Sequence, residues 1–146
     1  MSGVSLRLVT SEKEFWTLEK PWNDILSAST NSNVFLTFEW LRTWWKYFKK
    51  GYRLYIIVAE KAGQTIAILP LVLEKKRLIS TLKFIGRPGS DYCDILCCRE
   101  EVSLLPEILD ALLARHGWDH LWWGGMREDS LIFTALERWC DRRPLL

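Results

Sequence analysis

The segment Thr65–Leu73, TIAILPLVL, is apolar at every position after its first residue. Successive side chains of a strand point to opposite faces of the sheet. A run that is apolar on both faces therefore predicts a central strand, covered from both sides. Pro70 has no N–H and cannot donate a hydrogen bond to a neighbouring strand. We therefore expect a buried strand whose pairing has a bulge or splays apart at Pro70.

The flanking sequence predicts further strands and helices around this one. Lys61–Gln64 contains Gly63 and is typical of a hairpin turn from the preceding strand. The other strands are expected at Val4–Val9, Leu54–Ala59, Leu78–Ile85, Tyr92–Cys98 and His120–Gly124. Helices are expected from Ser11 to about Glu19, Pro21–Leu26, Phe38–Lys49, Glu101–Arg115, and from Asp129 or Ser130 to about Arg142. A loop is expected at Ser27–Asn33 between the second and third helices.

The resulting order, β-α-α-β-β-β-β-α-β-α, lacks the regular alternation of a doubly wound sheet. It predicts one domain of the α+β, or mixed α/β, class over residues 1–146. A chain of this length can bury about 68–70% of the surface that its unfolded form would expose. The sequence is therefore sufficient for one real core.

Composition and charge exclude several classes of protein. The net charge is +2, and the only compact basic run is Lys75–Arg77, which is too short to predict a nucleic-acid-binding surface. The longest apolar run, Ile66–Leu73, has eight residues, whereas a membrane span needs about 20. Met1–Thr10 lacks the pattern of a secretory signal. We expect a soluble, cytoplasmic protein with no membrane span and no nucleic-acid partner.

The four cysteines, Cys93, Cys97, Cys98 and Cys140, are expected to be free thiols in a chain too large to need a disulfide framework. Cys93 and Cys97, together with His116 and His120, have spacings similar to those of a zinc finger. The 18 residues between the two pairs exceed the finger spacing, and the histidines straddle a helix end and a strand start. We expect no metal.

The helix predicted at Phe38–Lys49 is apolar over more than half of its circumference. One stripe consists of Phe38, Leu41, Trp45 and Phe48, and the second consists of Trp40, Trp44 and Tyr47. The helix could be wedged between the sheet and a neighbouring element. Alternatively, the second stripe could form a surface for a ligand or a partner, since an exposed apolar patch usually has a use.

The loop between the two strands that follow the central one carries the densest set of polar side chains. It lies within Phe84–Leu96, FIGRPGSDYCDIL, and offers Arg87, Asp91, Tyr92 and Asp94. These groups could orient an amine or a sugar hydroxyl, or serve as a general base. Alternatively, the two carboxyl groups accept backbone hydrogen bonds in a tight turn.

Several short matches together resemble one family. They are Asn33–Leu41 (NVFLTFEWL), the Trp44–Trp45 pair, Ala67–Leu71 (AILPL), Phe84–Gly86 and Asp91–Leu96 (DYCDIL). The combination resembles the N-terminal half of CelD-like proteins of the GNAT acetyltransferase superfamily, near the FemAB-like transferases. The resemblance covers about Asn33 to Leu96.

The resemblance implies a GNAT-like central mixed, mostly antiparallel sheet flanked by helices, incomplete at the C-terminus. It implies acyl transfer from acetyl-CoA or another acyl-CoA to an amine or sugar acceptor, in polysaccharide or cell-envelope biosynthesis. The family's catalysis is largely positioning, with backbone N–H groups at a splayed strand polarising the thioester carbonyl. The implied acceptor contacts are Arg87, Asp91, Tyr92, Asp94, Trp40 and Trp44.

The sequence departs from the family at two places. The pyrophosphate loop should lie near Arg99, but Val102 and Leu104 stand where glycines belong. The chain also ends before the final strands of such a fold, so a C-terminal half or a partner protein could complete it. The alternative function is a noncatalytic module in which Trp40, Trp44, Trp122 or Trp123 stacks on sugars or on a partner protein.

Overall fold

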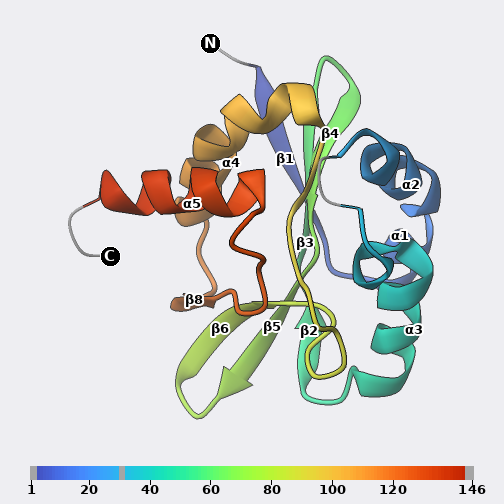
Figure 1. Ribbon diagram of the computed structural model, residues 1–146. Helices are drawn as coiled ribbons and strands as arrows, with labels where there is room; N and C mark the ends of the chain where they lie inside the picture. Colours follow the sequence, from blue (N-terminus) through green and yellow to red (C-terminus); the bar gives the residue numbers. More distant parts are fainter. Residues whose placement is uncertain (1–2, 30–31, 144–146) are drawn as a thin grey trace.

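The computed structural model describes residues 3–29 and 32–143. It contains two four-stranded sheets, with strand orders β1-β3-β4-β7 and β2-β5-β6-β8 (Figure 1). The strands are β1 Val4–Val9, β2 Tyr52–Leu54, β3 Ile56–Lys61, β4 Gln64–Leu69, β5 Leu71–Lys76, β6 Ile79–Phe84, β7 Leu96–Cys97 and β8 His120–Trp122. Within the described residues the strand pairs are antiparallel, except for the parallel pair of β6 and β8. The predicted α+β class is confirmed.

The two sheets part at Pro70, as the sequence predicts. The long apolar segment is divided there, because β4 pairs with β3 and β7 whereas β5 pairs with β2 and β6. The preceding arm of the hairpin is divided at the same level, where Tyr55 separates β2 from β3. The Pro70 carbonyl accepts a hydrogen bond from the Ile85 N–H at 2.8 Å, and the Tyr55 N–H donates to the Leu71 carbonyl at 2.9 Å. The break is therefore closed by backbone hydrogen bonds.

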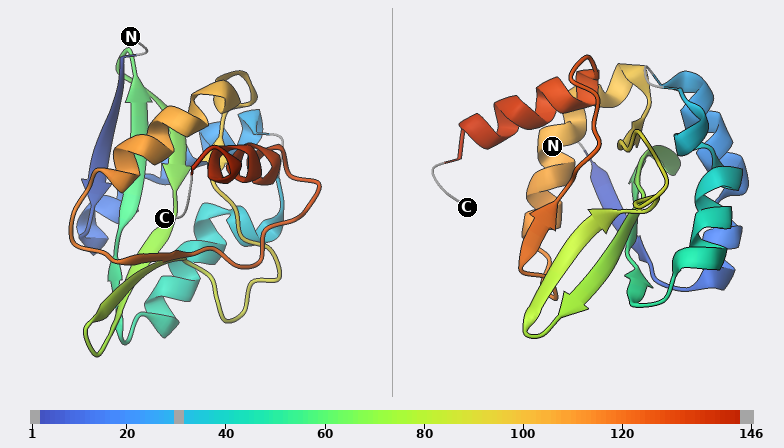
Figure 2. Two further views of the ribbon diagram at one scale, coloured as in Figure 1. Left: turned by 90° about the vertical axis from the view of Figure 1, so that its left-hand side faces the viewer. Right: turned by 60° about the horizontal axis from the view of Figure 1, so that its bottom comes forward.

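Helices cover both faces of the β1-β3-β4-β7 sheet (Figures 1 and 2). Helices α4 (Leu105–Leu113) and α5 (Leu131–Asp141) lie on one face, and α1 (Glu12–Trp16), α2 (Glu19–Ala28) and α3 (Phe38–Phe48) lie on the other. The strand β3 serves both faces because its side chains alternate. Ile57 belongs to the core under α4 and α5, whereas Ile56 belongs to the core under α1–α3.

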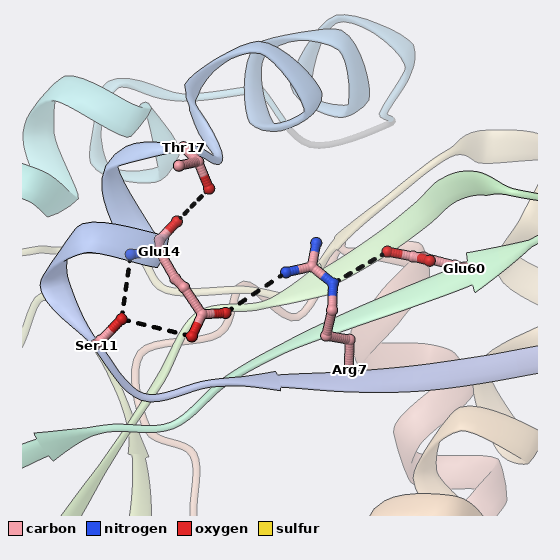
Figure 3. A network of polar contacts seen from close by, with 5 residues as sticks. All are labelled: Arg7, Ser11, Glu14, Thr17 and Glu60. Atoms are coloured by element: carbon pink, nitrogen blue, oxygen red, sulfur yellow. Dashed lines mark hydrogen bonds and ion pairs between the residues drawn. The ribbon is translucent and has the colours of Figure 1, made fainter.

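The start of α1 shows how local sequence fixes these elements (Figure 3). Ser11 is the N-cap, and its hydroxyl oxygen accepts a hydrogen bond from the Glu14 N–H at 3.2 Å. The Glu14 carboxylate also lies 3.8 Å from the Arg7 guanidinium, which in turn contacts Glu60 at 3.3 Å. The cap that the sequence predicts is confirmed, and β1, α1 and β3 are joined at this point.

Several sequence-based boundaries are wrong. The helix predicted from Ser11 to about Glu19 ends at Trp16, and α2 begins at Glu19 instead of Pro21. The strand predicted at Tyr92–Cys98 is reduced to β7, because residues 91–95 make other contacts described below. The helix predicted at Glu101–Arg115 is a 3-10 helix, η2 (Arg99–Leu104), followed by α4, and Pro106 lies at the N-terminus of α4 rather than inside a longer helix. The loop predicted at Ser27–Asn33 starts later, since α2 continues to Ala28; Thr30 and Asn31 lie outside the described residues.

Candidate functional site

The loop of residues 86–94, here called the corner loop, leaves β6 and turns toward α3. It begins at Gly86, whose φ is +119° and whose carbonyl accepts a hydrogen bond from the Ser90 N–H at 2.8 Å. A Cβ atom at Gly86 would lie 2.5 Å from the Ser90 hydroxyl oxygen. Only glycine fits this combination of backbone angle and close approach.

Two tryptophans of α3 hold the corner loop. Trp40 donates its indole N–H to the Ser90 hydroxyl at 2.8 Å, and Trp44 donates its own to the Pro88 carbonyl at 2.7 Å. Trp44 is 4% exposed, so its ring belongs to the core beneath the loop. The second stripe of the helix thus has a structural task in the free protein, namely to fix the shape of the loop.

A partly exposed aromatic cluster forms beside this contact. The ring of Phe35 lies 5.1 Å from that of Trp40 and 6.2 Å from that of Tyr92, both edge-on. The Arg127 guanidinium lies 5.0 Å from the centre of the Tyr92 ring and donates two hydrogen bonds of 2.8 Å to Asp129. Tyr92 is 40% exposed. The cluster therefore offers aromatic surface and a guanidinium at one place.

Asp94 lies at the buried end of the corner loop and has no exposed surface. One carboxyl oxygen accepts a hydrogen bond from the Ile95 N–H at 2.8 Å, and the other accepts from the Ser130 hydroxyl at 2.7 Å. Ser130 is the N-cap of α5 and accepts from the Ile132 N–H at 3.1 Å. Asp94 therefore joins the corner loop to the start of α5. The corner loop also contacts the segment between β8 and α5, where the Cys93 N–H donates a hydrogen bond to the Gly125 carbonyl at 2.9 Å.

The predicted acceptor residues thus separate into exposed and buried groups. Arg87, Asp91 and Tyr92 are exposed, whereas Asp94 is buried. The Arg87 side chain packs against Gly125, where an added Cβ would lie 2.5 Å from a guanidinium nitrogen. The exposed three are available to a ligand, and Asp94 acts through the residues that it positions. The substrate-binding assignment itself stays a prediction.

Sequence reasoning missed the contributions of Phe35, Gly125, Arg127 and Ser130. Asp129 or Ser130 is predicted as the start of the last helix, but the bond from Ser130 to Asp94 joins positions 36 residues apart. Phe35 lies between Val34 and Leu36 in an apolar run and has the appearance of a core residue. No local spacing marks these contacts.

Arg99, the residue expected to contact the cofactor, lies at the other end of β7, at the exposed start of η2. Glu100 and Glu101 follow it, and the Glu101 N–H donates to the Cys98 carbonyl at 2.9 Å rather than pointing to an open site. Val102 and Leu104 pack against the core under α4 and α5. A pyrophosphate needs free backbone N–H groups and positive charge, so these residues do not fit that part of coenzyme A.

The cysteines near the site are poor nucleophiles. Burial raises the pKa of Cys93 to about 11 and that of Cys97 to about 12. The thiolate is the reactive form, so both remain neutral thiols near pH 7. Among residues 3–29 and 32–143, no three His, Cys, Asp or Glu side chains gather in a way that could hold a metal ion. None of the helices in this same part of the chain is long and apolar enough to cross a bilayer.

Comparison with known proteins shows similarity in structure and not in sequence. No protein-family model matches the chain. No curated protein matches it either. Its structure is similar to the crystal structure of a possible acetyltransferase from Clostridium difficile 630, with 8% sequence identity and a TM-score of 0.48. The similarity covers 98% of this chain and 92% of the other.

Proposed function

We propose that this chain is an acyltransferase-type domain that transfers an acyl group from a thioester to a small amine or sugar hydroxyl. The observation that carries the proposal is the parting of the sheet at Pro70, where β4 and β5 belong to different sheets. The parting interrupts the regular ladders, although the Tyr55 N–H and the Pro70 carbonyl each make a backbone hydrogen bond in the free protein. Backbone N–H groups at an interruption of this kind can polarise a thioester carbonyl. The sequence resemblance to CelD-like proteins supports the same chemistry, and a role in polysaccharide or cell-envelope biosynthesis rests on that resemblance alone.

The acceptor side of the proposed site is the exposed part of the corner loop. Asp91 and Tyr92 are exposed there and can accept or donate hydrogen bonds to an amine or hydroxyl. Asp94 is a positioning residue, because both of its carboxyl oxygens already accept hydrogen bonds from the protein. The rigid loop would hold the acceptor in a fixed orientation, which is the main source of rate enhancement in a reaction of this kind.

The donor side is defined less completely by this chain. Acetyl-CoA or another acyl-CoA is the donor that the resemblance implies, but Arg99–Leu104 does not provide a cradle for its pyrophosphate. We therefore propose that the protein binds the donor mainly through its acyl-pantetheine arm, which carries the thioester. The nucleotide would be bound weakly, or by groups outside this chain.

Calorimetric titration with two donors tests the proposal. Acetyl-CoA and S-acetylpantetheine share the thioester arm, and only the first carries the nucleotide. We expect saturable heat with both, at affinities within about threefold of each other, a free-energy difference under about 0.7 kcal/mol. The variant Arg99→Ala should bind S-acetylpantetheine as the parent does, and Arg53→Ala is the control for loss of a surface charge. Absence of heat with both donors at millimolar concentration would remove the basis for an acyltransferase.

The aromatic cluster of Phe35, Trp40 and Tyr92 favours a second candidate, a noncatalytic carbohydrate- or protein-binding module. Partly exposed aromatic rings beside a guanidinium are typical of surfaces that bind sugars and proteins. Titration with oligosaccharides should then shift the tryptophan fluorescence in a saturable way, and Trp40→Phe should reduce that shift. If the tryptophan fluorescence of the parent protein did not change during the titration, a carbohydrate-binding function would be excluded.

A further inference from the structure

The hairpin of β5 and β6 projects from the body of the molecule, as Figure 2 shows, and its tip carries two exposed aliphatic residues, Leu78 and Ile79. Leu78 is 92% exposed and Ile79 is 57% exposed, although large aliphatic side chains are usually covered. Both lie at or next to the two-residue turn, since Lys76 pairs with Ile79. The tip therefore presents adjacent aliphatic side chains to solvent at the point farthest along the hairpin.

The turn itself is made against local preference. Arg77 has a φ of +56°, in the left-handed region. The first position of a two-residue hairpin turn is usually Gly, Asn or Asp, because other side chains are strained there. An arginine and a leucine in place of turn-forming residues reduce the stability of the hairpin. A departure of this kind from local preference is expected where a function requires the side chains.

Basic side chains surround the apolar tip. Residues 74–83 contain Lys75, Lys76, Arg77 and Lys83 against one acidic residue, Glu74. The Glu74 carboxylate pairs with Lys83 and with Lys76, the latter at 3.1 Å. On the neighbouring edge the carboxyl group of Asp119 accepts a hydrogen bond from the Ser80 N–H. The hairpin thus keeps a net positive charge of about three after its own acidic residue is counted.

A tryptophan extends this surface onto β8. Lys83 lies opposite Trp122 in the parallel pair of β6 and β8, and its ammonium nitrogen is 5.6 Å from the centre of the indole ring. Trp122 is 48% exposed. Residues opposite each other in neighbouring strands share a face of the sheet. The surface of Lys76, Ile79, Lys83 and Trp122 is therefore continuous with the turn.

We propose that this hairpin docks on the surface of an anionic lipid bilayer. Leu78 and Ile79 enter the boundary between headgroups and acyl chains, the lysines and Arg77 contact lipid phosphates, and Trp122 lies at headgroup depth. The order of the side chains along the hairpin matches the layers of a bilayer surface. The aliphatic tip corresponds to the acyl chains, and the basic residues and the tryptophan behind it correspond to the headgroups. A nucleic acid would contact the basic residues but gives no partner for the aliphatic tip. Binding would be peripheral, and it does not depend on the proposed acyl transfer.

Sedimentation with lipid vesicles tests the proposal with the whole chain. We expect binding to vesicles of phosphatidylcholine mixed with phosphatidylglycerol, little binding to pure phosphatidylcholine, and weaker binding at high salt. Arg77→Gly removes one cation and relieves the turn, so it should weaken binding about fivefold while raising the melting temperature. This variant therefore separates loss of binding from loss of folding. The matched control for charge is Lys13→Gln, on α1, which should leave binding unchanged.

A second variant tests the apolar part of the surface. Leu78→Ser should weaken binding to the mixed vesicles about tenfold, whereas Val34→Ser, at another site with an exposed aliphatic side chain, should not. Equal binding to both kinds of vesicle, or an effect of Lys13→Gln as large as that of Arg77→Gly, would overturn the proposal. The proposal would also fail if the protein bound DNA as tightly as mixed vesicles and Leu78→Ser weakened neither interaction. It would fail equally if Leu78→Ser changed the oligomeric state of the protein but left its binding to vesicles unchanged.

Discussion

Gly86 is the residue on which the shape of the corner loop depends. Its φ of +119° is strained for any other residue, and an added Cβ would overlap the Ser90 hydroxyl. We expect Gly86→Ala to reduce the free energy of unfolding by about 1–3 kcal/mol from the backbone alone, with a further loss from displacement of Ser90. Urea denaturation followed by tryptophan fluorescence measures the difference.

Gly51 provides the matched control for this substitution. Its φ is +88°, and nothing lies within 4 Å of the position of an added Cβ. Gly51→Ala therefore carries the backbone cost without the overlap. If the two variants lost equal stability, the close contact between Gly86 and Ser90 would not contribute, and the account of the loop given above would be wrong.

At this scale the sequence predicts what is local and fails where partners are distant. Ser11 is confirmed as the start of the first helix, and Ser130 is the N-cap among the two predicted starts of the last helix, because a cap depends on residues two or three positions away. The bond between Asp94 and Ser130 depends on how two segments meet in three dimensions. The sequence therefore indicates two roles for Asp94, contact with an acceptor or hydrogen bonding within a tight turn. It does not predict that Asp94 is buried.

The hairpin of β5 and β6 is the element whose charges carry a testable pH dependence. The hydrogen bond from Lys83 lowers the pKa of Glu74 below its usual value. A carboxyl group whose pKa is lower in the folded state stabilises the protein above its unfolded pKa of about 4.3. That contribution disappears as the pH falls through the folded pKa. Glu74→Gln should therefore cost about 1–2 kcal/mol at pH 7, and the difference should vanish in acid.

Thermal unfolding of both proteins between pH 7 and pH 3 checks this expectation. Glu128→Gln, in an exposed turn, is the control and should stay within about 0.5 kcal/mol of the parent. The same Glu74→Gln variant has one less negative charge on the hairpin, so it should bind anionic vesicles more tightly although it is less stable. A deficit in stability that persisted unchanged at pH 3 would show that the carboxylate is not its source.

The predicted ends of strands and helices are wrong where tertiary contacts compete with the local pattern. Residues 92–95 belong to the predicted strand, but the Cys93 N–H donates to the Gly125 carbonyl and the Ile95 N–H donates to the Asp94 carboxyl group. The ladder with β4 therefore begins at Leu96. Pro106 marks the start of α4 rather than an irregularity within a longer helix, as expected from the missing N–H of proline. Tertiary contacts decide such positions, and they are absent from any local pattern.

For the whole molecule, the central prediction from sequence was the break at Pro70, and it is confirmed. The hydrophobic run alone shows that both faces are buried, and proline alone shows that the ladder is interrupted. Neither shows that the preceding arm breaks at Tyr55 as well, which turns a local interruption into two separate sheets. That result follows from the register of β3 with β4 and of β2 with β5, which is a property of the assembled chain.

The two cores should nevertheless unfold together, because β3 contributes side chains to both of them. Ile56 and Ile57 are adjacent and fully buried, and they point into opposite cores. We expect Ile56→Ala and Ile57→Ala each to reduce the free energy of unfolding by about 2–5 kcal/mol. In both variants, circular dichroism and tryptophan fluorescence should report one common transition in urea. If either substitution split the unfolding into two transitions, each core would be stable without the other. The two cores would then be separate folding units, and β3 would not couple them.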